Sequence, residues 1–221
     1  MNLALIVFDW DGTLMDSEAR IVACLQAAFR DLGWPALPAE QAREVIGLGL
    51  EEALAHLLPQ GDVEQRAELA RRYRAHFLGD DQIPSELFPG ARETLNWLAE
   101  QGYLLAVATG KSRVGLNKSL AESGLAGIFA ATRTADETRS KPHPQMLLEL
   151  MDELGVRSTE TLMIGDTEYD LEMAHNAGVV ALAVCHGVHP PDRLLACKPL
   201  ACLDSLWAVR AWLAAHAHCI N

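Results

Sequence analysis

Two aspartates separated by a single residue, Asp9 and Asp11, follow an apolar run at the start of the chain. The run, residues 3–8, contains no polar residue, which is typical of a strand buried on both faces of a parallel sheet. Because side chains alternate along a strand, both carboxylates should lie on one side if the extended backbone continues through Trp10. A hard divalent cation such as Mg²⁺ would relieve their mutual repulsion. A simple turn at Gly12 is the alternative interpretation.

Polar residues that suit phosphate chemistry follow two further predicted strands. Thr109 and Gly110 offer a hydroxyl and a backbone amide that could hold a phosphoryl oxygen, although Thr109 also suits a turn or a helix cap. Lys141 stands beside Pro142, in a segment stiffened by prolines, where its ammonium would suit an anionic site. A solvated loop lysine is the alternative for Lys141.

A third acidic position, Asp166, follows the apolar residues 162–164 just as Asp9 follows the first strand. A further carboxylate at the same edge of the sheet indicates a metal site. Asp170 fits two interpretations, because its spacing from Thr167 is also that of a capping box at the start of a helix.

The elements that must position these residues alternate between apolar strands and helices from about residue 87 onward. Glycines at 102, 124, 155 and 178 stand where the helices should end. Strands are predicted at residues 103–108, 128–131, 162–164 and 179–184, with an edge strand at 200–203 and a last helix at 204–216. This alternation predicts an α/β fold with a doubly wound parallel sheet, at whose carboxyl edge the candidate residues converge.

The segment between the first strand and this alternating region has a different pattern. Helices are predicted at about 17–32, 40–46, 50–58 and 63–78, and no strand is predicted for some seventy residues after the first one. We therefore expect an α/β core made of residues 1–15 and 87–221, with residues 16–86 inserted as an all-helical cap domain.

Composition excludes several classes of function. The chain has 221 residues, 50% of them hydrophobic, a formal net charge of -12 and a pI near 5.0. These values argue against nonspecific binding to nucleic acid or to an anionic membrane. The five cysteines form no Cys-x-x-Cys pair, so neither a disulfide framework nor a zinc site is predicted. No signal peptide or membrane span is predicted, and we expect a cytoplasmic protein.

In their order along the chain, these motifs resemble those of the haloacid dehalogenase superfamily. The matching positions are Asp9-x-Asp11-Gly-Thr, Thr109, Lys141-Pro142, and Gly165-Asp166 with Asp170. The resemblance extends to the helical insertion, which is similar to that of phosphoglycolate phosphatase-like and beta-phosphoglucomutase-like members. It implies a Rossmann-like core and a Mg²⁺-dependent phosphatase acting on a small phosphorylated metabolite.

The same resemblance implies a role for each residue. Asp9 would be the nucleophile that forms an aspartyl-phosphate, and Asp11 would protonate the leaving alkoxide and then activate water. Asp9, the backbone carbonyl of Asp11, and Asp166 would bind Mg²⁺, with Asp170 either on the metal or behind its ligands. Lys141 would neutralise charge on the phosphoryl oxygens.

Residues present or absent narrow the chemistry. Dehalogenases of similar fold generally lack the second aspartate, and phosphonate hydrolases use a cap lysine, whereas no lysine precedes Lys111 here. A beta-phosphoglucomutase-type phosphotransferase would need a second basic phosphate site in the cap. The candidates for such a site are Arg20, Arg43, Arg66, Arg71, Arg72 and Arg74.

The remaining alternative is a phosphate-ligand-binding protein without turnover. Gly47 and Gly49 are candidates for a substrate-facing loop, although an ordinary turn between helices fits equally well. Phosphoglycolate, sugar phosphates and nucleoside monophosphates all stay open as substrates, and the sequence does not distinguish a monomer from a homodimer.

Overall fold

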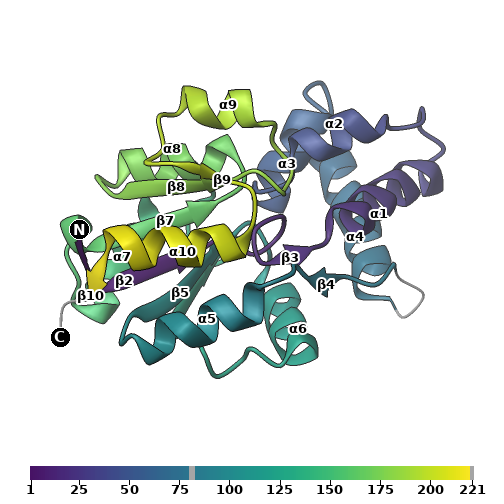
Figure 1. Cartoon of the computed structure of the whole chain (residues 1–221). Helices are drawn as coiled ribbons and strands as arrows, with labels where there is room; N and C mark the ends of the chain where they lie inside the picture. Colours follow the sequence, from purple (N-terminus) through teal and green to yellow (C-terminus); the bar gives the residue numbers. More distant parts are fainter. Residues whose placement is uncertain (80–82, 220–221) are drawn as a thin grey trace.

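The computed structural model describes residues 1–79 and 83–219 and contains a six-stranded parallel sheet in the order β6-β5-β2-β7-β8-β9 (Figure 1). The strands are β2 (Leu5–Phe8), β5 (Leu104–Thr109), β6 (Ala131–Thr134), β7 (Thr161–Gly165), β8 (Val180–Val184) and β9 (Cys202–Leu203). The first strand of the sheet along the chain, β2, lies between β5 and β7. The predicted doubly wound α/β fold is confirmed.

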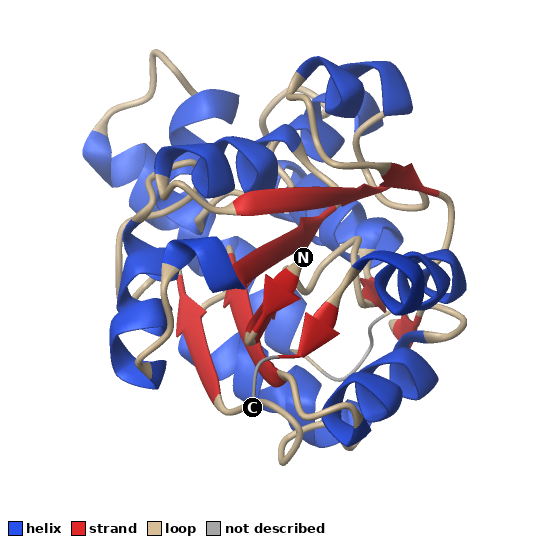
Figure 2. Ribbon diagram, turned by 60° about the vertical axis from the view of Figure 1, so that its left-hand side comes forward, coloured by secondary structure: helices blue, strands red, loops and turns tan. Residues whose placement is uncertain are grey.

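Helices cover both faces of this sheet (Figure 2). They are α5 (Ala91–Glu100), α6 (Arg113–Ser123), α7 (Gln145–Leu154), α8 (Glu168–Asn176), α9 (Pro191–Ala196) and α10 (Leu206–His216), with a short 3₁₀ helix, η1 (Ser158–Glu160). Ile6 and Phe8 of β2 pack in the cluster that contains α5, α6 and α10, whereas Leu5 and Val7 pack with α7 and α8. Alternate side chains of β2 are therefore buried on opposite faces, which explains its unbroken apolar sequence.

Four helices lie beyond the carboxyl edge of the sheet, on the right of Figure 1. They are α1 (Glu18–Asp31), α2 (Ala39–Glu44), α3 (Leu50–Leu57) and α4 (Val63–Leu78). They share a hydrophobic cluster of their own that includes Leu25, Leu54 and Leu69, all buried. Residues 80–82 of the predicted cap lie outside the described residues.

Two short strand pairs tie distant parts of the chain together. One is the antiparallel pair of β3 (Met15–Asp16) and β4 (Glu86–Leu87). It pairs the segment that leads from the sheet to the four helices with the segment that leads back. The parallel pair of β1 (Asn2–Leu3) and β10 (His218–Cys219) joins the two ends of the described chain. The chain thus passes from the sheet to the four helices and back through one two-stranded connection.

Three expectations from the sequence were wrong. The segment in which no strand was predicted holds Asp16 of β3 and Glu86 of β4 at its two ends, in a two-residue pairing too short to appear as an apolar run. The strand predicted at 128–131 begins at Ala131, because Ile128 lies in a turn and donates its backbone N–H to Leu125. The strand itself contains the polar residues Thr132 and Arg133, so it does not appear as an apolar run in the sequence. A disulfide also joins Cys185 to Cys202, whose Cα atoms are 6.2 Å apart. Adjacent strand ends bring these cysteines together, and no short sequence motif marks them.

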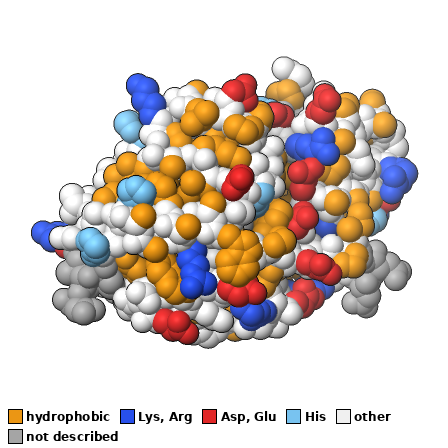
Figure 3. Space-filling view, in the orientation of Figure 1, with side chains coloured by type: hydrophobic (Ala, Val, Ile, Leu, Met, Phe, Trp, Pro, Cys, Tyr) orange, Lys and Arg blue, Asp and Glu red, His pale blue; other side chains and the backbone are white. Residues whose placement is uncertain are grey.

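Acidic and basic side chains are interspersed on the face drawn in Figure 3, and no broad basic area occurs among the residues coloured there. Orange side chains gather over α9 and α10, while charged ones are more frequent toward the four helices and along the lower edge. Within residues 1–79 and 83–219, none of the helices has the length and apolar character needed to cross a bilayer.

Candidate active site

The carboxyl ends of β2 and β7 bring Asp9 and Asp166 together, because the two strands are hydrogen-bonded neighbours and Asp9 N donates to Ile164 O at 2.9 Å. Lys141 reaches the same place from the loop before α7. Its Nζ lies 2.7 Å from Asp9 Oδ1 and 2.6 Å from Asp170 Oδ1. All four side chains are buried, so the structure brings these predicted residues into one cluster.

Asp9, Asp166 and Asp170 each offer a carboxylate oxygen, and these oxygens lie within 4.8 Å of one another. Asp166 is held by Thr13, whose Oγ1 donates to Oδ1 at 2.6 Å, and by the N–H of Val188, which donates to Oδ2 at 2.9 Å. Asp9 Oδ2, by contrast, is buried without a hydrogen-bond partner among the described residues. An all-oxygen, buried donor set with one free oxygen fits a hard divalent cation.

The charges of this cluster do not balance. Burial raises the pKa of Asp9 well above its ordinary value, with Lys141 opposing the shift and Asp170 adding to it. Burial and Asp170 raise the pKa of Asp166 to about 7. For Lys141, burial acts to lower the pKa, but Asp170 and Asp9 together hold it above its usual range. Three carboxylates around one ammonium therefore leave excess negative charge that a cation would offset.

Asp170 occupies the capping position that its spacing predicts, and its role at a metal stays a prediction. Its Oδ2 accepts from the Thr167 N–H at 3.1 Å, as in the capping box at the start of α8, and also from Thr167 Oγ1 at 2.7 Å. Its Oδ1 pairs with Lys141. One side chain thus begins a helix and also fixes the lysine of the cluster.

The Asp11 carboxylate lies in different surroundings from the Asp9 carboxylate. Ser17 Oγ donates to Asp11 Oδ1, and Lys111 Nζ lies 2.9 Å from the same oxygen. Neither partner was predicted from the sequence: Ser17 directly precedes α1, where its side chain makes no capping bond, and Lys111 was given no role. The position of Lys111 directly after Thr109-Gly110 was the available indication.

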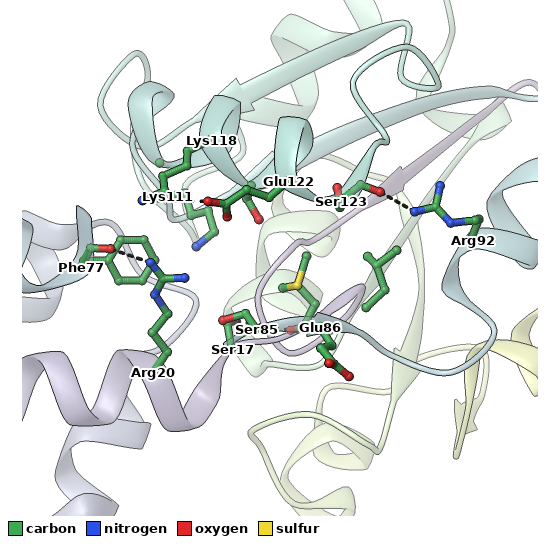
Figure 4. A pocket seen from close by; sticks show the side chains of 14 residues that line it. Ser17, Arg20, Phe77, Ser85, Glu86, Arg92, Lys111, Lys118, Glu122 and Ser123 are labelled. Carbon is green, nitrogen blue, oxygen red and sulfur yellow. Dashed lines mark hydrogen bonds and ion pairs between the residues drawn. The ribbon is translucent and has the colours of Figure 1, made fainter. Parts of the chain in front are cut away.

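Lys111 stands between two cavities. Its Nζ lies 4.5 Å from the ring centroid of Phe77, and the Arg20 guanidinium lies 4.8 Å from the same centroid. On one side is a cavity of about 280 Å³, shown in Figure 4, which Ser17 and Arg20 also line. On the other side is a cavity of about 690 Å³ that extends from Asp9 to the four helices.

Most of the remaining candidate site residues line the larger cavity. Asp9, Asp11, Thr109, Gly110 and Gly47 all line it. Thr109 is buried, and its Oγ1 accepts the N–H of Lys111 at 3.2 Å, so the predicted local turn bond is also present.

Gly49 is not among the residues that line this cavity, and instead donates its N–H to Ser140 Oγ at 2.7 Å. The loop from Gly47 to Gly49 packs closely on the sheet edge. A Cβ on Gly110 would lie 2.3 Å from the carbonyl oxygen of Leu48, so only glycine fits there. Nearby, Tyr169 Oη donates to Glu44 O at 2.7 Å. Residues 44–49 are therefore held against the cluster by backbone contacts.

Known proteins that are similar in sequence to this chain are hydrolases and phosphatases by name. The family model described as haloacid dehalogenase-like hydrolase matches residues 6–184. A Dickeya dadantii protein named probable phosphatase IndB is 40% identical over 217 residues, covering 96% of this chain and 94% of that protein. A phosphoglycolate phosphatase of Aliivibrio fischeri is 31% identical over 206 residues, covering 90% and 91%.

Among solved structures, a hydrolase from Pseudomonas syringae has the same fold, with a TM-score of 0.87 at 22% identity over 97% of this chain and 99% of that one. The family match and the phosphatase relatives span nearly the whole chain, including the strand ends that hold the cluster. The chain therefore belongs to the haloacid dehalogenase-like hydrolase family, as a hydrolase of the phosphatase type.

Proposed function

We propose that this protein is a Mg²⁺-dependent phosphatase that hydrolyses a small phosphate monoester through a phosphoryl group transferred to Asp9. The observation that carries the proposal is Asp9 Oδ2, which is buried without a hydrogen-bond partner among the described residues although Asp9 lines the larger cavity. A carboxylate oxygen with no partner, next to a cavity that can admit a substrate, suits a nucleophile.

The three-carboxylate cluster supports the metal. Asp9, Asp166 and the backbone carbonyl of Asp11 would hold Mg²⁺, which prefers oxygen ligands and would offset the excess negative charge. We place Asp170 behind these ligands, because one of its oxygens pairs with Lys141 and the other accepts from Thr167. The bound ion would supply charge neutralisation at the phosphoryl oxygens.

The proposed reaction has two steps. A carboxylate oxygen of Asp9 forms a bond to phosphorus as the ester P–O bond breaks, and Asp11 gives its proton to the leaving alkoxide. Asp11 then takes a proton from water as that water attacks phosphorus, which releases inorganic phosphate and restores the Asp9 carboxylate. Lys141, Thr109 and the backbone N–H of Gly110 would bind the phosphoryl oxygens.

We further propose that residues 16–86 act as a cap over this site. Three features support it: the separate hydrophobic cluster of α1–α4, the narrow connection through β3 and β4, and the cavity between these helices and Asp9. Gly47 would border the substrate, while Gly49 would dock the loop on Ser140.

Interactions of the arginines weigh against the phosphotransferase alternative. Arg43 is paired with Glu18, and Arg71 and Arg72 are paired with Glu68. Arg66 donates to two backbone carbonyls, and Arg20 donates to Phe77 O. Of the six candidates, Arg74 alone lines the larger cavity, so the described residues do not support a second cluster of cap cations for a bisphosphate within that cavity.

A phosphate-release assay on the purified protein tests the proposal. Release of phosphate from 4-nitrophenyl phosphate should require Mg²⁺, stop on addition of EDTA, and return when Mg²⁺ is restored in excess. Binding of phosphate esters without release would favour the non-catalytic alternative. Activity that persists in EDTA would exclude the proposed metal dependence.

A further inference from the structure

The larger cavity has more room than a short hydroxy acid would fill. Its volume of about 690 Å³ lies well inside the range of roughly 300 to 1,000 Å³ that is usual for sites enclosing drug-sized ligands. With a phosphorylated two-carbon acid bound at Asp9, much of this space would hold water against apolar walls. A site of this shape favours a larger leaving group.

The walls away from the sheet edge are mainly apolar. Leu48, Leu50, Tyr73 and Phe77 line the cavity from the segment of the four helices and are partly exposed, and Val114 of α6 lines it from the sheet side. Burial of apolar surface is favourable and needs no specific partner, so these walls would favour the binding of a leaving group with apolar faces.

The cations nearest the reaction centre already have partners. Lys141 is paired with Asp9 and Asp170, and Lys111 is paired with Asp11 while its Nζ lies over the Phe77 ring. A substrate carboxylate placed next to the phosphoryl group would have to draw Lys111 away from Asp11. A leaving group without charge avoids this cost.

The two arginines that line the cavity do not change this conclusion. Arg74 and Arg139 are both exposed, and Glu51 and Glu52 line the same cavity. Because acidic and basic groups occur together at this outer part, they do not form a selective site for an anion.

We propose that the enzyme acts on phosphate monoesters of bulky, uncharged, ring-containing alcohols of about nucleoside size, and discriminates against phosphorylated short hydroxy acids. This inference rests on the proposed phosphatase function and names its substrate class. It is supported by the volume of the cavity, by its apolar walls and by the ion pair that Lys111 forms with Asp11.

The first test compares 2-phenylethyl phosphate with ethyl phosphate. The two leaving alcohols have similar acidity, so the ratio of the two kcat/KM values depends mainly on how well the leaving group fits the cavity. We expect a ratio of at least ~10 in favour of the phenylethyl ester, since each apolar group well placed in a pocket contributes on this scale. Uridine 5′-monophosphate should likewise be preferred over phosphoglycolate. Equal values for the matched pair, or a preference for phosphoglycolate, would overturn the inference while leaving the phosphatase function intact.

The second test places a charge on the apolar wall. Val114 lines the cavity, whereas Leu195 does not; their exposed fractions are similar, 63% and 55%, so neither change disturbs a core. Val114→Asp should lower the phenylethyl-to-ethyl ratio ~5-fold or more, and Leu195→Asp should leave it unchanged. An unchanged ratio in Val114→Asp would count against the inference. If no ester is hydrolysed by the wild-type protein with Mg²⁺, it is the proposed function that fails.

Discussion

The two walls of the larger cavity are built on different principles. At the sheet edge, buried charged groups have specific partners at short distances, such as Lys141 Nζ to Asp9 Oδ1 at 2.7 Å. On the opposite wall, α1, α3 and α4 contribute mainly apolar side chains with no directional bond to a ligand. On the proposed function, the strand ends would fix the chemistry, while helix packing would select the leaving group. Variants on the two walls should therefore change different kinetic constants.

The largest effect is expected at the sheet edge. Asp9→Asn removes the proposed nucleophile, so kcat should fall by more than ~10,000-fold. The fold should persist, because Asn is similar in size and removes a buried charge that burial disfavours. Phosphate release and thermal unfolding measure the two quantities. Asp16→Asn, at an exposed position in β3, is the matched control and should retain activity. Comparable turnover in Asp9→Asn would exclude Asp9 as the nucleophile.

A smaller loss is expected where Lys111 holds Asp11. Lys111→Met removes the ion pair at 2.9 Å and leaves Asp11 with Ser17 alone, so Asp11 should be less well positioned. We expect kcat to fall by about 10- to 100-fold, the scale that a misplaced catalytic group costs.

Lys118→Met is the control for this variant, since Lys118 lines only the smaller cavity and its side chain is one-third exposed. Lys111→Arg keeps a cation near Asp11 and should restore part of the rate. Equal kcat values for Lys111→Met and Lys118→Met would show that the ion pair with Asp11 has no positioning role.

The charge imbalance at the sheet edge predicts a pH effect on the metal-free protein. The pKa of Asp166 is raised to about 7 in the fold, chiefly by burial, against ~3.9 for an unfolded aspartate. Its contribution to stability is therefore fully present below about pH 4 and is lost as the pH rises through about 7. In EDTA, the free energy of unfolding should be lower at pH 7.5 than at pH 5, by up to a few kcal/mol, at roughly 1.4 kcal/mol per unit of pKa shift.

Added Mg²⁺ binds the ionised carboxylates, so it should remove most of this decline with pH. Asp166→Asn should weaken the pH dependence in EDTA, with the part due to the raised pKa of Asp9 retained, and Asp204→Asn, at an exposed aspartate outside the cluster, should leave it unchanged. Denaturant unfolding at pH 5 and pH 7.5 measures the free energy of unfolding of the wild-type protein in EDTA, of the wild-type protein with Mg²⁺, and of the two variants in EDTA. A metal-free protein that is equally stable at both would mean that Asp166 is ionised in the fold without a cation.

Sequence alone predicted the sheet edge well, because strand ends combine a local pattern with a general rule of topology. Asp9 and Asp166 were placed together by their positions after apolar runs, and the structure puts those runs in neighbouring strands. Of the two interpretations of Asp170, the capping box is confirmed, since it depends on residues close in sequence, and a role of Asp170 at a metal stays a prediction.

Features that depend on side-chain packing between distant segments were not predictable in this way. The contacts of Asp11 with Lys111 and of Gly49 with Ser140 join residues far apart in the chain, and no short motif records them. The contact of Asp11 with Ser17, six residues away, depends on how the chain turns between them. The apolar residues of the cavity wall have the same helical spacing as ordinary core residues, so their role becomes visible only once the cavity is seen.

The smallest effect is expected on the helical wall, at a contact that holds it in place. Tyr169→Phe removes the hydrogen bond from Tyr169 Oη to Glu44 O, a bond of 2.7 Å at the protein surface. A single such bond contributes about 0.5 to 1.5 kcal/mol, so KM for the preferred ester should rise no more than ~10-fold. Because this residue touches neither Asp9 nor Asp11, kcat should change little, in contrast to Asp9→Asn and Lys111→Met. A fall in kcat with KM unchanged would mean that docking of residues 44–49 positions the sheet-edge groups themselves, and that the two walls do not act separately.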